Sequence, residues 1–440
     1  MTPQADGLDG ADIVRVGFTD LHGVPRGKDV PVEAFDAVRE HGIGCTEAIM
    51  TTGLRHNVVA GFEHGFRDLA VVPDLDTMRP VPWEPGVAWC LADFHDHLTG
   101  GPYEADPRGV VRRLTAAWAE VGLEPVVAPE LEFYVLDADG GDPYVARNSS
   151  VYTAGVAADP RGILHELVRA LRGVGLGPTT AAQEFGHAQY EVNLRHGPAL
   201  DGADRALRLK AVVKDVAVRH GLHATFMGKP RDGDEGSGFH LHVSLRHGGT
   251  GANAFDDPAG ADGLSPTARA FAAGVLAHMP ALTALLDPTV NAYRRFEDQS
   301  LAPTHVNWGL DNKLALLRVP PERGAAARIE VRSGDGSANP YLLVGGILAA
   351  GLLGVRDGAE LPAPVRDNPY DEADDRLGPR LPADLGAALD ALEADPPLVE
   401  LVGERLVELF LLVKRDELHR FRHDQLRVTA WEREEYGTLL

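Results

Sequence analysis

The sequence predicts an α+β protein built from two regions, and three observations support this prediction. At 440 residues the chain is longer than one ordinary hydrophobic core can accommodate, so two or three domains are expected. The first part of the chain carries strand–turn–strand patterns, whereas helical and strand-like segments alternate through the remainder. Between them, Gly100, Gly101 and Pro102 have the composition of a linker, which divides the chain into residues 1–101 and 102–440.

The first region is predicted to hold short strands and one helix. Residues 13–18 form an apolar, strand-like run that turns into a second run over residues 24–28. Residues 34–40 have the pattern of a short helix that ends at Gly42. Residues 87–93 then give the strand that closes the region.

The second region opens with a well-marked helix start. Asp106 is a good N-cap residue, Pro107 suits the first helical position, and an apolar stripe that includes Trp118 follows. Further helices are predicted over residues 163–171, 204–220, 267–285, 342–353, 385–394 and 398–421, and strands over residues 223–227 and 238–245.

Composition and charge exclude several classes of function. The 42 Lys and Arg residues against 65 Asp and Glu residues give a formal charge of −23, which argues against nucleic acid or an anionic membrane as the main partner. Cys45 and Cys90 make neither a disulfide framework nor a thiolate metal site, so a cytoplasmic location is expected. The most apolar run, residues 341–355, is interrupted by glycines and is too short to span a bilayer.

Residues 126–136 have the alternation of a half-buried strand. One face carries apolar side chains, and the other carries Glu130 and Glu132. These carboxylates would lie about 7 Å apart and would repel each other unless water or cations lay between them. Taken alone, this pair favours a solvent-facing strand.

Two further strand-like segments carry polar side chains on one face. His240 and His242 share a face of the first, although such a pair is more often a surface or packing feature than a metal site. Arg328, Glu330 and Arg332 share a face of the second, where cross-strand ion pairs on an exposed sheet are the alternative.

Glu184 and Glu191 bracket a short segment that contains Gly186. Their odd spacing would put them on opposite faces of a regular strand, but the glycine permits a bend that aims both the same way. Together, the four segments offer glutamates and histidines to one space, and oxygen-rich ligation with an imidazole suits Mg²⁺ or Mn²⁺. Nearby arginines, including Arg295 and Arg318, suit phosphate oxygens and carboxylates, so the pattern predicts a divalent-metal phosphoryl-transfer site.

Ordered motifs along nearly the whole chain identify a family. They lie at residues 18–23, 73–77, 103–108, 129–133, 236–242, 291–295, 328–332 and 339–341, with Trp431, Glu432 and Tyr436 near the end. In these motifs the chain resembles the glutamine synthetase family. The resemblance implies a small N-terminal β-grasp-like domain and a catalytic domain whose curved antiparallel sheet is flanked by helices. It also implies a homo-oligomer, a dodecamer of two stacked six-membered rings, with each active site between two subunits.

The same resemblance implies ATP, two divalent cations and a set of site residues. Glu132, Glu184 and Glu191 match the ligands of one metal ion. Glu130, His240 and Glu330 match those of the second. Other matched positions are Arg295 and Arg332 for the carboxylates of glutamate, Gly236 beside them, Arg318 and Arg328 for phosphate or nucleotide, and His242 and Ser244 near the nucleotide.

The implied reaction has two steps, and the chain departs from the family where the second begins. ATP phosphorylates the γ-carboxylate of glutamate, and an amine then displaces phosphate. Thr46 stands where the family has an aspartate that binds ammonium, and Leu301 stands where it has a flap glutamate. Because ammonium needs an anionic cage, these changes predict an organic amine, such as a polyamine, ethanolamine, an alkylamine or an aromatic amine. The alternatives are an ordinary glutamine synthetase and a non-catalytic relative with an assembly or regulatory role.

Other departures concern the acid substrate and the phosphate. Lys313 replaces an arginine near the transferred phosphate, which keeps the charge but loses the bidentate fork. Glu235 replaces an asparagine that borders the glutamate site, so it is open whether the acid is strictly glutamate. Tyr370 lies in a loop resembling one that is adenylylated in some members, although a loop kept without regulation is the favoured interpretation.

Overall fold

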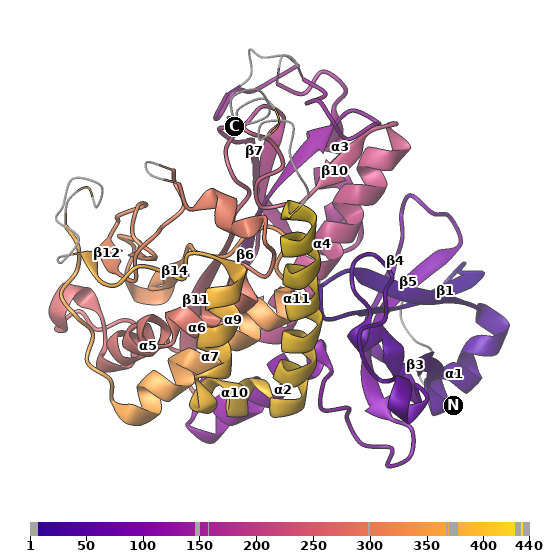
Figure 1. Cartoon of the computed structure of the whole chain (residues 1–440), viewed down its shortest axis with the longest axis horizontal. Helices are drawn as coiled ribbons and strands as arrows, with labels where there is room; N and C mark the ends of the chain where they lie inside the picture. The colour runs from indigo at the N-terminus through magenta and orange to yellow at the C-terminus, as the bar shows by residue number, and fades with distance from the viewer. Residues whose placement is uncertain are drawn as a thin grey trace.

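The computed structural model describes residues 8–145, 150–156, 158–297, 300–366, 368, 377–426 and 433. These residues form one five-stranded and one nine-stranded sheet with helices packed around them, which confirms the predicted α+β fold (Figure 1). Tyr370, together with Trp431, Glu432 and Tyr436, lies outside the described residues.

The first sheet builds the β-grasp-like N-terminal part of the chain. Its strand order is β2-β1-β5-β4-β3. Strands β1 and β5 pair in parallel, and the other strand pairs of this sheet are antiparallel. Helix α1 ends at Gly42, whose φ of 73° lies in the left-handed region, as the sequence predicts. The bounds are β1 Ile13–Thr19, β2 Pro25–Pro31, α1 Phe35–His41, β3 Ile43–Thr46, β4 Asp68–Pro80 and β5 Val87–Asp96.

The second sheet is organised around its longest strand, β6. Its main order is β12-β13-β14-β11-β6-β8-β7, and β9 and β10 also pair with β6. All pairs are antiparallel except β12 with β13. The bounds are β6 Leu123–Leu136, β7 Pro178–Gln183, β8 Gln189–Leu194, β9 Gly197–Pro198, β10 His223–Thr225, β11 Phe239–His247, β12 Trp308–Leu310, β13 Leu317–Val319 and β14 Ile329–Val331.

Helices cover the apolar face of this sheet, and α7 lies deepest among them (Figure 1). The α-helices are α2 Pro107–Glu120, α3 Ile163–Gly173, α4 Ala199–Arg219, α5 Pro266–Ala277, α6 Met279–Leu286, α7 Pro340–Asp357, α9 Leu385–Glu393, α10 Pro396–Val402 and α11 Glu404–Gln425. Short 3₁₀ turns are η1 Val32–Ala34, η2 Glu47–Thr51, η3 Phe62–His64, η4 Ala261–Gly263, η5 Ala292–Arg295 and η6 Gly324–Ala326. Among the described helices, α7 by itself has the length and hydropathy of a membrane span, but 78% of that window is buried inside the protein, as in a core helix.

Two helices predicted as continuous are broken, so the predicted continuity was wrong in both. Residues 267–285 form α5 and α6, which meet at His278 with a bend of 74°; Pro280, in the first turn of α6, has no N–H for the helical ladder. Residues 398–421 divide into α10 and α11 at Gly403, whose φ is 118°. The predicted start of α2 is confirmed, because the Asp106 side chain accepts a hydrogen bond from the Arg108 N–H at 3.1 Å.

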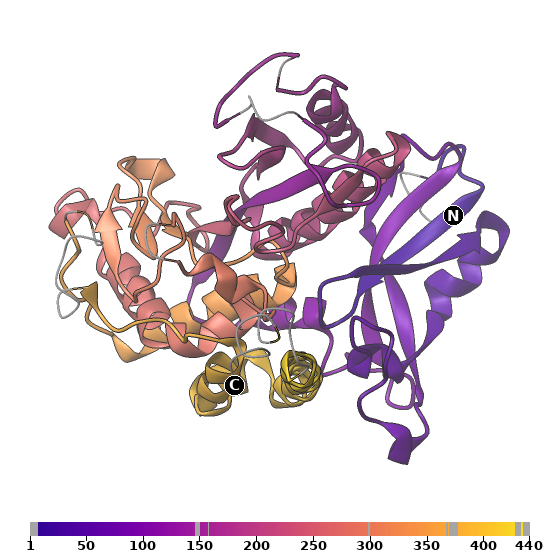
Figure 2. The ribbon, with the colours of Figure 1, turned by 45° about the horizontal axis from the view of Figure 1, so that its top comes forward.

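The N-terminal sheet lies beside the second part of the chain (Figure 2), and the start of α7 contacts it. The Asn339 side chain caps α7 and also donates to the backbone oxygens of Asp20 at 3.0 Å and Leu21 at 3.3 Å. A side chain on Gly23 would lie 2.7 Å from the Asn339 Cα atom, so the two backbones touch here. The domain division after residue 101 stays a prediction; β5 ends at Asp96 and α2 begins at Pro107.

Helices α5 and α7 cross with their backbones in contact. A Cβ atom added to Gly274 would lie 2.6 Å from the Gly354 Cα atom, and one added to Gly354 would lie 2.6 Å from the Gly274 Cα atom. Real Cβ atoms do not approach backbone so closely, and neither helix can give way without moving the core around it. The crossing therefore requires glycine on both helices.

We expect Gly354→Ala to lower the midpoint of urea unfolding. Alanine gains about 1 kcal/mol of helix propensity, but forcing the two backbones apart costs about 1–3 kcal/mol or more, and the clash prevails. Gly141→Ala is the matched control, since its added Cβ would meet nothing within 4 Å. Equal midpoints for the two variants would contradict the crossing described here.

Candidate active site

Two adjoining cavities lie on the polar face of the second sheet. The acidic cavity, about 400 Å³, is lined by Glu130, Glu132, Glu184, Glu191 and Glu330 together with histidines and arginines. The neighbouring cavity, about 800 Å³, extends along β6 and β11 and shares part of its wall with the acidic cavity. The shared wall consists of Glu130, His242 and Arg318.

Strand β6 places the first carboxylates by its alternation. Leu131 and Phe133 are buried against the helices, while Glu130 and Glu132 point to the opposite face. In the antiparallel ladders Glu130 lies opposite His240 of β11, and Glu132 lies opposite Glu191 of β8. The predicted sharing of one space by these side chains is therefore what the register produces.

Strand β14 adds the next group. Glu330 lies opposite His242 on one side and Arg318 of β13 on the other. Arg318 donates to the Glu330 carboxylate at 2.7 Å, and Arg332, the residue that follows β14, also binds it. Glu330 is 1% exposed, so these arginines compensate a buried charge.

The turn between β7 and β8 brings in Glu184. The Glu184 N–H donates to the Gln189 oxygen at 2.9 Å, and Ala188 adopts a positive φ of 59° to close the turn. Gly186 packs directly on Tyr134, because an added Cβ would lie 2.6 Å from the tyrosine Cζ atom. Glu184 and Glu191 thus both line the acidic cavity, as the bend at Gly186 predicts.

Crowding of like charges dominates the electrostatics of the acidic cavity. Burial, followed by the neighbouring carboxylates Glu132 and Glu130, raises the pKa of Glu184 to about 7. The same causes raise the pKa of Glu191. Burial also opposes ionisation of Glu330, but Arg332 and then the two histidines lower the pKa of that carboxyl to about 2.

The donor set of the acidic cavity fits hard divalent cations. Ligand atoms of Glu130, Glu191 and His240 lie within 4.8 Å of one another. Carboxylate oxygens with one imidazole are the ligands of Mg²⁺ and Mn²⁺ rather than of a thiolate-rich site.

Two arginines border the acidic cavity beside these carboxylates. Arg295 donates to the buried Asp287 carboxylate at 3.0 Å and to the Ser333 oxygen at 3.2 Å. The Nε atoms of Arg295 and Arg332 have no protein partner within the described part of the chain. Other predicted site residues that line this cavity are Glu235, Gly236, Leu301 and Lys313.

The predicted nucleotide residues gather in the neighbouring cavity. Ser244 and Arg328 line it together with the shared residues His242 and Arg318. The Ser244 hydroxyl donates to the Ala327 oxygen at 3.0 Å, and Arg328 pairs with Glu322 at 3.2 Å.

Thr46 is the predicted site residue that the chain does not bring to these cavities. It ends β3 in the N-terminal sheet, where its hydroxyl accepts from the Ala48 N–H at 3.3 Å and caps η2. It lines neither cavity of its own chain.

The sequence prediction missed several residues that support the site. Gln189 donates to Glu132 at 3.1 Å, and Asn193 donates to Glu130 at 2.5 Å. Both share a face of β8 with Glu191, so the period of two was a signal that would have found them. Lys229, which also lines the acidic cavity, gave no comparable signal.

One face of the sheet carries carboxylates, histidines and arginines together, which is the composition of a metal-dependent, phosphate-handling enzyme. Comparisons with known proteins identify the family. The model of the glutamine synthetase catalytic domain matches residues 104–436. The chain is 38% identical to a glutamine synthetase of Pyrococcus abyssi, with 96% of each chain covered. It is 36% identical to one of Methanocaldococcus jannaschii, with 96% of this chain and 94% of the other covered.

Solved structures agree with this. A structure titled as a GmaS/ADP complex superposes with a TM-score of 0.88 at 32% identity, covering 99% of this chain and 100% of the other. A structure titled as a novel glutamine synthase homolog superposes with a TM-score of 0.83 at 29% identity, covering 93% of this chain and 95% of the other. The chain belongs to the glutamine synthetase family. It is an ATP-dependent ligase that forms carbon–nitrogen bonds.

We expect Glu132→Ala and Glu330→Ala each to abolish ATP turnover, because each removes one carboxylate from the acidic cavity. Release of phosphate from ATP, with Mg²⁺ and with Mn²⁺, measures the effect, and size-exclusion chromatography checks assembly. Glu124→Ala on the same strand is the control, since Glu124 is exposed and lines neither cavity. Turnover retained in either cavity variant would show that the assignment is wrong.

Proposed function

We propose that this ligase joins glutamate to an organic amine, forming a γ-glutamyl amide through a γ-glutamyl phosphate. The observation that carries the proposal is Leu301, a 42% exposed apolar side chain in the lining of the acidic cavity. The family resemblance gives a glutamate there. A leucine can neither cage ammonium nor accept its proton, but it suits an alkyl or aromatic substituent.

Two further large apolar side chains belong to the lining of the acidic cavity. Tyr152 and Phe185 line the same cavity and are 69% and 51% exposed. Exposed large apolar side chains that gather at one cavity commonly mark a ligand site. The coverage of 99% and 100% against GmaS structures adds support for a ligase with this chain's overall shape.

The six metal-ligand positions are proposed as two sets. Glu132, Glu184 and Glu191 hold one divalent cation. Glu130, His240 and Glu330 hold the other. When bound, such cations neutralise charge on the transferring phosphoryl group.

ATP is proposed to occupy the neighbouring cavity through His242, Ser244, Arg318 and Arg328. Because His242 and Arg318 belong to the shared wall, the γ-phosphate of a nucleotide there would reach the acidic cavity at this point. Arg318 and Lys313 then stabilise charge on the phosphoryl group as it leaves ADP for the γ-carboxylate.

The acid substrate is proposed to bind beside Arg295 and Arg332. Their Nε atoms are unpartnered donors in the described structure, and guanidinium groups bind carboxylates well. Gly236 is required because a side chain there would lie 2.6 Å from the Arg295 Cγ atom. Glu235 lines the same cavity, and its charge favours placing the substrate α-amino group rather than its α-carboxylate on that side.

In the second step the amine nitrogen attacks the acyl carbon of the γ-glutamyl phosphate. The carbon–oxygen bond to phosphate breaks, and the proton lost by the nitrogen leaves with the phosphate as HPO₄²⁻. Ammonia as the nucleophile is the second candidate, favoured by the name glutamine synthetase of the Pyrococcus abyssi and Thermococcus kodakarensis relatives, at 38% and 36% identity.

Steady-state assays with ATP and glutamate, comparing ammonia with a panel of alkylamines, aromatic amines, ethanolamine and polyamines, separate the two candidates. We expect at least one organic amine to exceed ammonia in kcat/KM by about tenfold or more, since an apolar contact of one or two methylenes contributes about 1–3 kcal/mol. Product mass identifies the amide. Glutamine formation as the fastest reaction would establish the second candidate instead.

Leu301→Glu tests the proposed wall directly. A carboxylate there favours ammonium and disfavours an apolar substituent, so the ratio of ammonia to amine kcat/KM is expected to rise about tenfold or more. Leu301→Met keeps volume and polarity and is the control. An unchanged ratio would place the amine elsewhere.

We further propose an oligomer, a dodecamer of two stacked six-membered rings, with each site completed by a neighbouring chain. Thr46 lies in the N-terminal sheet and reaches neither cavity of its own chain, so a role at the site requires a second subunit. Mixed oligomers that combine Glu330→Ala chains with N-terminal-sheet variants test this by recovery of activity. A cytoplasmic location stays a prediction.

A further inference from the structure

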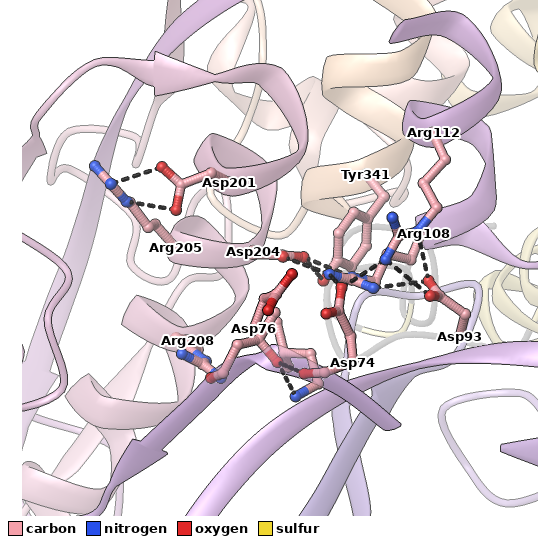
Figure 3. A network of polar contacts seen from close by, with 12 residues as sticks. Asp74, Asp76, Asp93, Arg108, Arg112, Asp201, Asp204, Arg205, Arg208 and Tyr341 are labelled. Carbon is pink, nitrogen blue, oxygen red and sulfur yellow. Dashed lines mark hydrogen bonds and ion pairs between the residues drawn. The ribbon is translucent and has the colours of Figure 1, made fainter. Parts of the chain in front are cut away.

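A buried ion-pair network joins the N-terminal sheet to the catalytic helices. Arg108 of α2 is 2% exposed and binds Asp204 of α4 through two hydrogen bonds of 2.9 and 2.8 Å (Figure 3). It also binds Asp93 and Asp74 at 2.8 Å each. Arg112 adds contacts to both of these aspartates, so all charges in this network are paired.

A cavity of about 330 Å³ lies next to this network and outside the active site. Its walls are β4, the turn at residues 174–176 after α3, and the first half of α4. Five arginines line it, and three of them have carboxylate partners: Arg108, Arg112 and Arg205. The remaining two are Arg79 and Arg208.

Arg208 is a buried cation that makes no direct ion pair among the described residues. It is 4% exposed, lies 5.0 Å from the centroid of the Trp89 ring, and donates to the backbone oxygens of Thr77 at 2.5 Å and Trp89 at 3.3 Å. Its Nε has no partner, and no carboxylate lies within 4.0 Å of its guanidinium among the described residues. Burial lowers the pKa of Arg208 to about 10; the charge of Asp204 opposes this shift and the charge of Arg79 adds to it.

Arg79 supplies a second guanidinium to the same cavity. It donates to the backbone oxygens of Asp76 at 3.0 Å and Met78 at 2.5 Å, and within the described ranges it has no carboxylate partner. Carbonyl oxygens satisfy some N–H groups but do not neutralise a charge. The two guanidinium groups of this cavity therefore repel each other, and within the described residues neither has a carboxylate in direct contact.

We propose that this cavity binds a small oxyanion, a carboxylate or phosphate group, between Arg79 and Arg208. Guanidinium N–H groups bind both kinds of oxyanion through charge-assisted hydrogen bonds. Five arginines and four aspartates, Asp74, Asp76, Asp201 and Asp204, line the cavity, which leaves one net positive charge. The cavity therefore suits one small anion and disfavours a polyphosphate.

Binding there would link the two parts of the chain. Arg79 lies on β4 of the N-terminal sheet and Arg208 lies on α4 of the catalytic part. A ligand that binds both stabilises the folded arrangement by mass action, so the thermal midpoint rises with its concentration.

Selenate soaked into crystals of the full-length protein locates the site by its anomalous scattering. We expect a peak between the guanidinium groups of Arg79 and Arg208. Calorimetric titration with inorganic phosphate and, separately, with succinate then shows which group binds more tightly. A peak confined to the two cavities of the active site, or no binding of either probe beyond that site, would overturn the proposal.

Variants of the three nearby arginines give the quantitative test. Arg79→Gln and Arg208→Gln are expected to weaken phosphate or succinate binding about tenfold or more, and to remove the concentration-dependent rise of the thermal midpoint. Arg205→Gln is the matched control and is expected to change binding less than about threefold, because Asp201 already neutralises Arg205.

If Arg208→Gln fails to fold, Arg79→Gln decides, because Arg79 is exposed and its loss spares the buried contacts of Arg208. Binding unchanged in Arg79→Gln would refute the site. ATP turnover of the arginine variants is measured in parallel. The proposed oxyanion site does not require that these variants lose turnover, and it does not depend on which amine the enzyme uses.

Discussion

Repulsion among carboxylates on one face of β6 is the constraint on which this structure depends. Glu130 and Glu132 share that face, β8 beside it adds Glu191, and β14, two strands away, adds Glu330. Such an arrangement is unfavourable by itself, because burial and like charges both disfavour ionised carboxyl groups. It persists because the opposite face, with Leu131 and Phe133, is anchored in the hydrophobic core.

The charges that offset this repulsion come from β11 and β13. His240 and His242 of β11 contact Glu130 at 3.0 and 3.4 Å, and Arg318 of β13 contacts Glu330. The compensation is partial, since Glu184 and Glu191 keep raised pKa values. The negative charge of these carboxylates is only partly neutralised by the protein, and the sheet holds them in place. Such a face is suited to bind cations and, through them, phosphate, which is the chemistry of the family.

The same principle recurs at the junction of the two parts of the chain, with a different outcome. Arg108 is more deeply buried than any arginine of the active site, yet its aspartate partners from β4, β5 and α4 neutralise it. Paired charges there hold the N-terminal sheet in place, together with the contacts of Asn339 to the Asp20 segment. Arg79 and Arg208 are the arginines beside this network that have no carboxylate in direct contact in the described part of the chain.

Much of the fold and the site followed from local pattern. Alternation over residues 126–136 and 239–243 gave the correct faces of β6 and β11, because a strand side chain can point in only two directions. Helix continuity was less predictable. The periodicity of residues 267–285 and 398–421 continues through His278 and Gly403, where the chain bends because of a following proline and a left-handed glycine.

The sequence by itself determined which residue types face the site and which family motifs hold them, since both depend on short-range order along the chain. Only the tertiary structure decided which side chains meet. Strand register set Glu132 against Glu191, and domain docking kept Thr46 away from the cavities of its own chain. The tertiary structure also forms the arginine-lined cavity at the junction, from segments that are distant in sequence. Pairing between distant segments depends on packing and register, which local periodicity does not encode.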